Sequence, residues 1–380
     1  MVAGTVTFRA LACLNPPQGF RFSGKSGTIN EYPIFLNPKG AISMHIPENY
    51  LSPETCAVMT LAMAPAWYMA VSKVKKEIPK ERLPLLGVGA AFAFLAMMFN
   101  VPLPGGTTGH AVGGTLLAVL FGPWAACLAI SVALGVQAVF FGDGGILAFG
   151  ANCFNMAFVL PFAGYGIYSL VKKLLPAHPI AAAGIGAYVG INGAAFCAAV
   201  EFGVQPLLFQ DAAGQALYCP YPLSVSLPAM MLGHLTLFGL AEVVFTTAVL
   251  GYLAKTAPDV VRGAAHIAAK TSRAVYALVA LLIVGTPLGL LAEGTAWGEW
   301  GADEIAETTA SGAALGYTPQ GMETGFSFDA LFPDYAIEGL TDVTGYILSA
   351  VLGAALLIIT FKVLASFKKK ETNYDVPAEN

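Results

Sequence analysis

The chain has 380 residues, of which 56% are hydrophobic and only 11% are charged. Soluble domains carry about 25% charged residues, so this composition excludes an ordinary water-soluble globular protein. The formal net charge is -4, and no basic patch points to nucleic acid. The six cysteines form no CxxC pair, and several lie in apolar runs, where cysteine packs as a small hydrophobic group.

Residues 1–43 differ in character from the rest of the chain. They contain Arg9, Arg21, Lys25 and Lys39 among scattered prolines, and their longest apolar run is only 10–14. A secretory signal needs an apolar core of roughly 7–15 residues, so this segment is not a signal peptide. We expect 1–43 to be an extension that is either not translated or removed, which leaves Met44 as the first residue. An ordinary soluble extension is the alternative.

Apolar runs begin after Met44 and predict an all-α polytopic membrane protein. About 20 residues are needed to cross a hydrocarbon core of roughly 30 Å. Gly122 and Pro123 interrupt the stretch 109–140, so its first part is expected to be a half-helix or a re-entrant segment. Nine spans are predicted, a seven-span core and a two-span C-terminal unit, near 54–72, 83–100, 109–121, 124–140, 149–171, 180–205, 223–253, 274–292 and 343–365.

The distribution of basic residues predicts the orientation. The chain has 19 Lys and Arg residues, four of them before Met44. With nine spans and Met44 outside, all of the others fall on the cytoplasmic side or at its edge, as the positive-inside rule requires. We therefore expect the N-terminus outside and the C-terminus in the cytoplasm, in a multi-pass protein of the plasma membrane.

The outer loop 293–342 is acidic and contains no Lys or Arg. Either it is an ordinary solvated loop, or its charge raises the local concentration of cations. Because it separates the last two spans from the others, 272–380 is treated as a second unit. No Walker A, HExxH, GxSxG or GxGxxG motif occurs in a suitable context. The chain is therefore not expected to hydrolyse ATP or to be an enzyme, and any energy that it uses must come from a partner or a gradient.

Two of the five histidines, His45 and His110, fall on the predicted outer side. His110 is framed by glycines, which let backbone approach the ring closely. A lone membrane histidine is more often a packing or hydrogen-bonding group, but the shared side and the glycine frame favour a ligand pair. Imidazole suits zinc, copper, iron and nickel.

The chelate improves if Met44 is the first residue. Its α-amine, the His45 backbone nitrogen and the His45 ring then form fused chelate rings, and His110 supplies a fourth nitrogen. Such a set suits square-planar Ni(II) or Cu(II), and Co(II) with some adjustment. This interpretation makes 44–255 the metal-binding membrane core.

Other polar residues lie within the predicted spans. Asn152 and Asn155 are one turn apart, and they either orient His110 or the terminal loop or bridge helices. Glu242 lies mid-span, where an ionisable group is a functional hypothesis. His234 lies two turns before Glu242, about 12 Å away along the axis, so the two cannot both contact one ion.

Several of these segments resemble one family. Met44-His45-Ile46-Pro47, then Gly109-His110-Ala111-Val112-Gly113-Gly114, then Gly150-Ala151-Asn152 with Phe154-Asn155-Met156-Ala157, look like the CbiM/NikM family. Its members are the substrate-specific components of energy-coupling-factor transporters. The resemblance implies Co2+ or Ni2+ as transported substrate, with cobalt favoured and cobalamin biosynthesis as its use. It also implies a transmembrane coupling subunit and cytoplasmic ATPase subunits as partners.

The resemblance maps the metal ligands onto Met44, His45 and His110. Residues 272–380, with Leu331-Phe332-Pro333-Asp334-Tyr335, look like the small CbiN/NikN accessory subunit fused in line, although this match is looser. A nickel-specific uptake component is the nearest alternative. A membrane metal sensor or a metalloenzyme is the alternative from another class.

Overall fold

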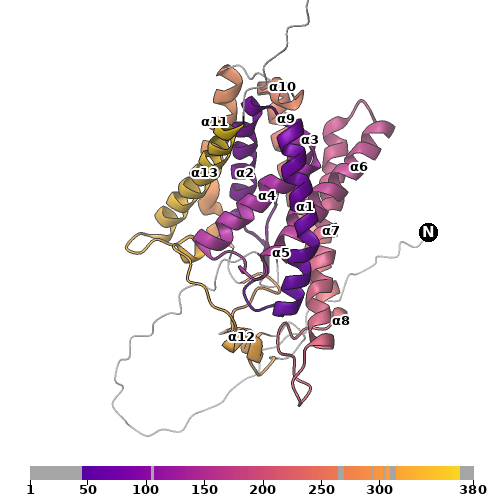
Figure 1. Ribbon diagram of the computed structural model, residues 1–380, viewed down its shortest axis with the longest axis vertical. Coiled ribbons are helices and arrows are strands. Elements are labelled where there is room, and N and C mark those ends of the chain that lie inside the picture. Colours follow the sequence, from indigo (N-terminus) through magenta and orange to yellow (C-terminus); the bar gives the residue numbers. More distant parts are fainter. Residues whose placement is uncertain are drawn as a thin grey trace, which may run out of the picture. The chain divides into compact units, whose positions relative to one another are not determined.

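The computed structural model describes residues 45–103, 107–263, 269–292, 295–302, 304–308 and 314–368. The expectations for 1–43 and for Met44 lie outside these residues. Within them the chain is almost entirely helical (Figure 1). In chain order the helical elements are α1 (Pro53–Glu77), η1 (Lys80–Arg82), α2 (Leu83–Met97), α3 (Gly114–Phe121), α4 (Pro123–Val136), η2 (Gln137–Phe141), α5 (Phe149–Asn152), η3 (Cys153–Val159), α6 (Leu160–Leu174), α7 (Pro179–Leu208), α8 (Leu223–Gly233), η4 (His234–Phe238), α9 (Gly239–Thr256), α10 (Pro258–Val261), α11 (Ala269–Gly285), η5 (Thr286–Leu291), η6 (Ile305–Glu307), α12 (Gln320–Thr324), η7 (Pro333–Tyr335) and α13 (Asp342–Phe367).

Seven helices in the described residues are long and apolar enough to cross a membrane. They are Pro53–Glu77, Pro123–Phe141, Phe149–Leu174, Pro179–Leu208, Leu223–Thr256, Arg273–Leu291 and Asp342–Phe367. Large apolar side chains on them face outward, for example Leu61 and Tyr68 of α1 at 72% and 74% exposure. Exposed apolar surface on this scale is stable only against lipid, so the chain is a polytopic, all-α membrane protein.

Two of the nine predicted spans differ from the observed helices. The range 83–100 contains α2, which has only 15 residues and ends at Met97. The range 109–121 contains α3, which has only eight residues, because Gly109 ends the strand β2 (Thr107–Gly109) and 110–113 form a loop. This strand pairs antiparallel with β1 (Val101–Leu103). These two ranges were therefore predicted too long.

The predicted break in the stretch 109–140 is confirmed. Helix α3 ends at Phe121 and α4 begins at Pro123. Between them Gly122 has a φ of +88°, a conformation that glycine adopts at little cost. The half-helix is thus terminated by backbone geometry that any other residue would strain.

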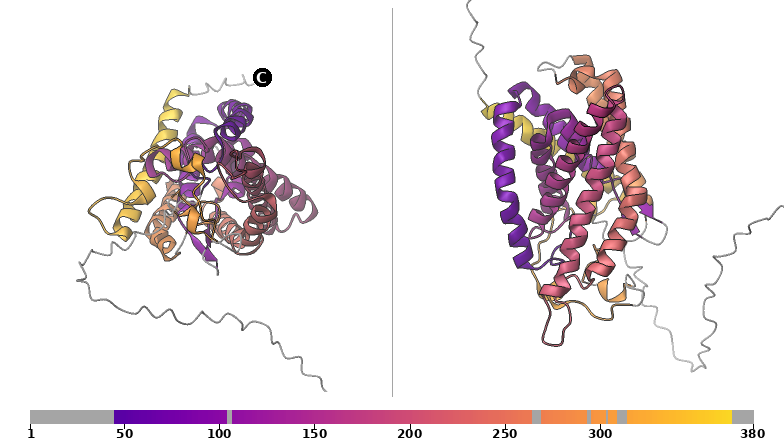
Figure 2. Two further views of the ribbon diagram at one scale, coloured as in Figure 1. Left: turned by 90° about the horizontal axis from the view of Figure 1, so that it is seen from below. Right: turned by 90° about the vertical axis from the view of Figure 1, so that its right-hand side faces the viewer.

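The short helix α2 lies at the centre of the core, where all of its residues except Pro84 and Leu85 are buried. Helix α13 packs along it. The contact is close at Gly353, where an added Cβ would lie 2.1 Å from the Phe94 ring. On the other side of the bundle α6 packs against α7, and several long helices, among them α1 and α7, run roughly parallel (Figure 2). The C-terminal unit therefore shares its core with the spans that precede it.

Basic side chains gather where several elements meet at one end of the bundle. The Lys368 ammonium donates to the Ile78 carbonyl at 2.6 Å, and the Arg82 guanidinium donates to the Val260 carbonyl at 3.4 Å. Helix α10 lies at this end, and α12, from the predicted outer loop, lies at the opposite end (Figure 1). This arrangement is the one expected if the α10 end faces the cytoplasm.

The orientation is testable with single cysteines introduced at Lys76 and Ala314. Both positions are exposed and lie in segments with opposite predicted sides. In intact cells an impermeant maleimide is expected to label Ala314→Cys but not Lys76→Cys, and lysis should expose the second. The unsubstituted chain measures background labelling. If only Lys76→Cys were labelled in intact cells, the predicted orientation would be wrong and the opposite one would hold.

Candidate metal centre

The segment that follows Met44 is held inside the protein by the side chain of Asn152. The Ile46 amide donates to the Asn152 Oδ1 at 3.0 Å, and the Asn152 Nδ2 donates to the Ile46 carbonyl at 3.1 Å. The Gly145 amide also donates to the Ile46 carbonyl, at 2.9 Å. Two-way pairing with a buried side-chain amide fixes both the position and the direction of this segment.

Glu48 anchors the same segment to the loop before α5. Its carboxylate accepts hydrogen bonds from the Ile146 and Leu147 amides, at 2.6 and 3.1 Å. Burial raises the pKa of the Glu48 carboxyl, while these two backbone bonds act in the opposite direction. Gly145 permits the approach, because an added Cβ there would lie 2.8 Å from the Glu48 backbone.

His45 is buried, with 2% of its surface exposed. Its Nδ1 lies 2.9 Å from the Asp143 Oδ1. Its Nε2 is enclosed and has no hydrogen-bond partner among the described residues. A carboxylate at Nδ1 holds the proton on that nitrogen and leaves the lone pair on Nε2. This is the protonation state in which an imidazole binds a metal through Nε2.

His110 lies beside His45, with ring centroids 5.3 Å apart and an interplanar angle of 77°. It is carried by the loop between β2 and α3, and its Nδ1 donates to the Ala111 carbonyl at 3.1 Å. The structure thus brings together the two histidines that the sequence singled out, 65 positions apart along the chain.

Glu242 of α9 fixes the loop that carries His110. Its carboxylate accepts from the Val112 amide at 2.7 Å and from the Gly113 amide at 2.9 Å. These amides lie at the N-terminus of α3, where unsatisfied donors and the helix dipole favour a negative charge. Glu242 therefore bonds to backbone rather than facing the rings.

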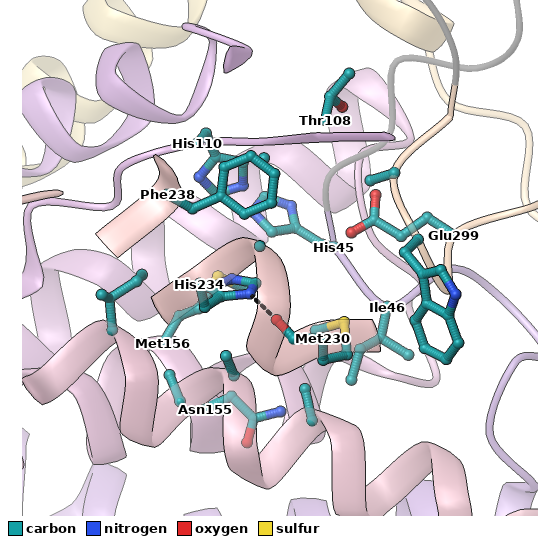
Figure 3. Close-up of a pocket in the computed structure, with 18 of the residues that line it drawn as sticks. His45, Ile46, Thr108, His110, Asn155, Met156, Met230, His234, Phe238 and Glu299 are labelled. Carbon is teal, nitrogen blue, oxygen red and sulfur yellow. Dashed lines mark hydrogen bonds between the residues drawn. The ribbon is translucent and has the colours of Figure 1, made fainter. Parts of the chain in front are cut away.

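A cavity of about 100 Å³ opens beside the two rings. Figure 3 shows a third imidazole, His234, across this cavity from His45 and His110. The His234 Nδ1 pairs with the Met230 carbonyl at 2.8 Å. Asn155 and Met156 line the same cavity, and the Asn155 Nδ2 donates to the Glu201 carboxylate at 2.9 Å.

Three π-helical segments among the described residues adjoin the site. The segment η3 contributes Asn155 and Met156 to the cavity, and η4 contributes His234 and Phe238. The third, η2, supplies Gln137, whose Nε2 donates to the Asp143 Oδ2 at 3.2 Å. Single π-turns within helices occur frequently at functional sites, and here they come from three separate spans.

The acidic loop before α13, which is predicted to lie outside, also reaches the cavity. Glu299 lines it, and Figure 3 shows the carboxylate directed toward the rings. Its Oε2 is enclosed and has no hydrogen-bond partner in the described part of the chain. Burial, with the charge of Asp143 as a second cause, raises the pKa of the Glu299 carboxyl well above its usual range. From the sequence, the loop was expected either to be an ordinary solvated loop or to raise the local concentration of cations, and neither expectation placed Glu299 at the cavity.

The described residues contain no group of three or more His, Cys, Asp and Glu side chains arranged to hold a metal ion. They contribute two adjacent imidazoles, a third across the cavity and a nearby carboxylate. Fold and site together define a class: a polytopic helical membrane protein with a buried, imidazole-lined cavity between its spans.

The comparison with protein families identifies the chain more closely. Residues 45–260 match the family described as CbiM, the cobalt uptake substrate-specific transmembrane region. Residues 270–370 match the PDGLE domain. The chain belongs to the CbiM family, with a PDGLE domain in line behind the core, which confirms the resemblance predicted from the sequence. Its family is one of metal transport proteins rather than enzymes.

Several relatives share the fused arrangement. The chain is 52% identical over 323 residues to a probable fused nickel transport protein, LarMN, of Lactiplantibacillus plantarum, covering 84% of this chain and 97% of that protein. It is 47% identical over 330 residues to the fused nickel transport protein NikMN of Rhodobacter capsulatus, covering 83% and 95%. A crystal structure of a truncated transition metal transporter is similar with a TM-score of 0.54 and 56% identity, covering 56% of this chain and 99% of that one.

The packing at Gly145 yields a test of how tightly the segment after Met44 is held. Gly145→Ala places a Cβ against the Glu48 backbone and is expected to destabilise the protein by about 1–3 kcal/mol, as overpacking does. Thermal unfolding in detergent measures the change. Gly166→Ala is the matched control, because an added Cβ there meets nothing within 4 Å. Equal melting temperatures for both variants would contradict the observed packing.

Proposed function

We propose that this chain is the metal-recognising membrane component of an ATP-driven uptake transporter of the energy-coupling-factor type, with Ni2+ as preferred ion and Co2+ as second. The observation that carries the proposal is the pair of buried imidazoles, His45 and His110, with ring centroids 5.3 Å apart. Buried polar groups inside a membrane protein are costly and are typical of a substrate site. The cavity beside them gives an ion a place to lie.

The choice of ion rests on the relatives. The resemblance to the CbiM/NikM family made cobalt the first expectation, with nickel as the alternative. The two fused relatives described above are both named for nickel, and they share the whole arrangement of core and C-terminal unit. This supports nickel. If cobalt is the ion carried, cobalamin biosynthesis is its expected use.

The ligands proposed are the Met44 amine, the His45 backbone nitrogen and ring, and the His110 ring. A chelate with the backbone nitrogen requires Nδ1 of His45, since only that ring nitrogen closes a six-membered ring with it. In the structure Nδ1 faces Asp143 and Nε2 is the unpartnered nitrogen. We propose that the ring turns about its Cβ–Cγ bond on chelation, so that Nε2 then donates to Asp143. Asn152, through Ile46, would hold the segment in both states.

The partners proposed are a transmembrane coupling subunit and cytoplasmic ATPase subunits. The sequence contains no phosphate-cradling loop in a suitable context. A component that only recognises the ion needs such partners to drive reorientation and release. The end of the bundle with the basic residues is the surface expected to face the ATPases.

The histidine pair is tested by metal binding to the purified chain. His45→Ala and His110→Ala are each expected to weaken Ni2+ binding strongly. The loss should exceed the roughly 10–100-fold that follows when a residue that only hydrogen-bonds a metal ligand is removed. Equilibrium dialysis with Ni2+ and with Co2+ measures the affinities. His178→Ala is the control, because His178 is exposed at the start of α7, away from the cavity lining.

The same variants test transport when they are expressed with the coupling and ATPase subunits. Cells with the wild-type chain and with His178→Ala should accumulate nickel, and cells with the other two variants should not. Normal uptake by His45→Ala or His110→Ala would refute the proposed site. Absence of uptake by the wild-type chain for both ions would refute the proposed function.

The terminal chelate is tested separately from a plain histidine pair. In a chain that starts at Met44, one Ala inserted between Met44 and His45 keeps both rings but moves the amine away. We expect the affinity or the preference between Co(II) and Ni(II) to shift strongly, because the insertion adds a backbone amide to the chelate and changes the position of His45 relative to His110. N-terminal sequencing of the protein purified from membranes establishes the start. An unchanged titration would exclude the amine as a ligand.

A further inference from the structure

Tyr335 lies in the C-terminal PDGLE domain, within the Leu331–Tyr335 motif noted in the sequence, and its side chain is fixed by packing. Only 2% of the residue is exposed. The ring stacks on Phe141, with centroids 4.8 Å apart and an interplanar angle of 21°. Phe94 and Tyr346 contact it edge-on, with centroids 6.2 and 5.5 Å away. Rings from η2, α2 and α13 therefore leave Tyr335 little freedom.

The backbone at this position is strained. Asp334 and Tyr335 have φ values of +54° and +60°, in the left-handed region that residues other than glycine enter at a cost of about 1–3 kcal/mol each. Neighbouring bonds hold them there. The Phe332 amide donates to the Phe140 carbonyl at 2.8 Å, and the Ser349 hydroxyl donates to the Tyr335 carbonyl at 2.8 Å. Strain of this kind persists where the surroundings fix a functional geometry.

The conformation directs the Tyr335 hydroxyl onto Asp143. The hydroxyl donates to the Asp143 Oδ2 at 2.5 Å, and the Gln137 Nε2 donates to the Tyr335 hydroxyl oxygen at 2.9 Å. The other carboxylate oxygen, Oδ1, faces the His45 Nδ1 at 2.9 Å. Burial, followed by the charge of Asp143, raises the pKa of Tyr335 well above its usual range, so the phenol remains a donor.

We propose that Tyr335 is a positioning residue of the metal centre, which orients the ligand ring of His45 through Asp143. The inference rests on the proposed function, since it assigns His45 to the ion. A hydrogen bond to one carboxylate oxygen fixes the direction of the other, and the carboxylate in turn fixes the ring and its basicity. The C-terminal domain therefore contributes to the affinity of a site whose proposed ligands all lie in the core.

The proposal is specific to one hydroxyl group and has a matched control. Tyr335→Phe keeps the packed ring and removes the donor to Asp143. Tyr346→Phe removes an equally buried hydroxyl from the neighbouring ring, one that donates to the Met98 carbonyl at 2.9 Å. Comparison of the two variants separates an effect on His45 from the general cost of removing a buried hydroxyl group.

The experiment titrates the purified full-length chain with Ni2+ and records the visible spectrum of the Co2+-loaded protein. Tyr335→Phe is expected to weaken Ni2+ binding by about 10-fold or more and to shift the Co2+ d–d bands. Tyr346→Phe should change the affinity by less than about twofold and leave the spectrum unchanged. Melting temperatures of the metal-free proteins show whether both variants are folded.

Each result bears on the proposal. Wild-type affinity and spectrum for Tyr335→Phe would overturn it, and so would equal weakening by both variants. If Tyr335→Phe does not fold, Asp143→Asn removes the carboxylate through which Tyr335 is proposed to act on His45, and wild-type binding by that variant would equally overturn the proposal. If the wild-type chain binds neither ion, the proposed function fails and the positioning role fails with it.

Discussion

Asp143 places a carboxylate where only 3% of the residue is exposed, directly beside a histidine at 2% exposure. Burial of a charged carboxylate costs free energy unless both of its oxygens are paired or hydrogen-bonded. One oxygen faces the His45 ring and the other accepts from Gln137 and Tyr335. The remaining geometry of the centre follows from this pairing, because it requires segments from three distant parts of the chain to meet.

The helices around the centre have irregular turns where they meet it. The left-handed Gly142, with φ of +69°, ends η2 and turns the chain so that Asp143 faces inward. On the other side of the rings, the Glu242 carboxylate accepts hydrogen bonds from amides at the start of α3 and does not face the rings. The amides at the N-terminus of α3 therefore hold the loop that carries His110, because they bind the Glu242 carboxylate where the helix dipole favours a negative charge.

Much of the fold follows from the length of the apolar runs and from the residues that interrupt them. The apolar runs located the seven long spans. A helix that crosses a membrane needs a continuous apolar stretch, whichever helices lie next to it. The Gly122-Pro123 break followed from local backbone chemistry. The ranges 83–100 and 109–121 were predicted too long, since hydropathy does not distinguish a helix from the non-helical chain that follows Met97 and precedes Gly114 within an apolar region.

The centre was predictable only in part. His45 and His110 were found because histidine is rare in this chain and both fall on one side. Asp143 and Tyr335 were not, because an acidic residue in a loop and a tyrosine 192 positions later have no shared sequence signal. His234 was recognised as polar but not placed at the cavity, where a π-turn orients it, and π-turns have no reliable sequence pattern. Glu299 was one of many acidic residues in its loop.

The central claim is that the rings of His45 and His110 hold the transported ion. Diffraction from crystals of the Ni2+-loaded full-length chain, with data collected at the nickel absorption edge, tests it most directly. We expect a single strong anomalous peak between the two rings, with the His45 ring still bonded to Asp143. A peak in the acidic loop 293–342, with none beside His45 and His110, would contradict this claim.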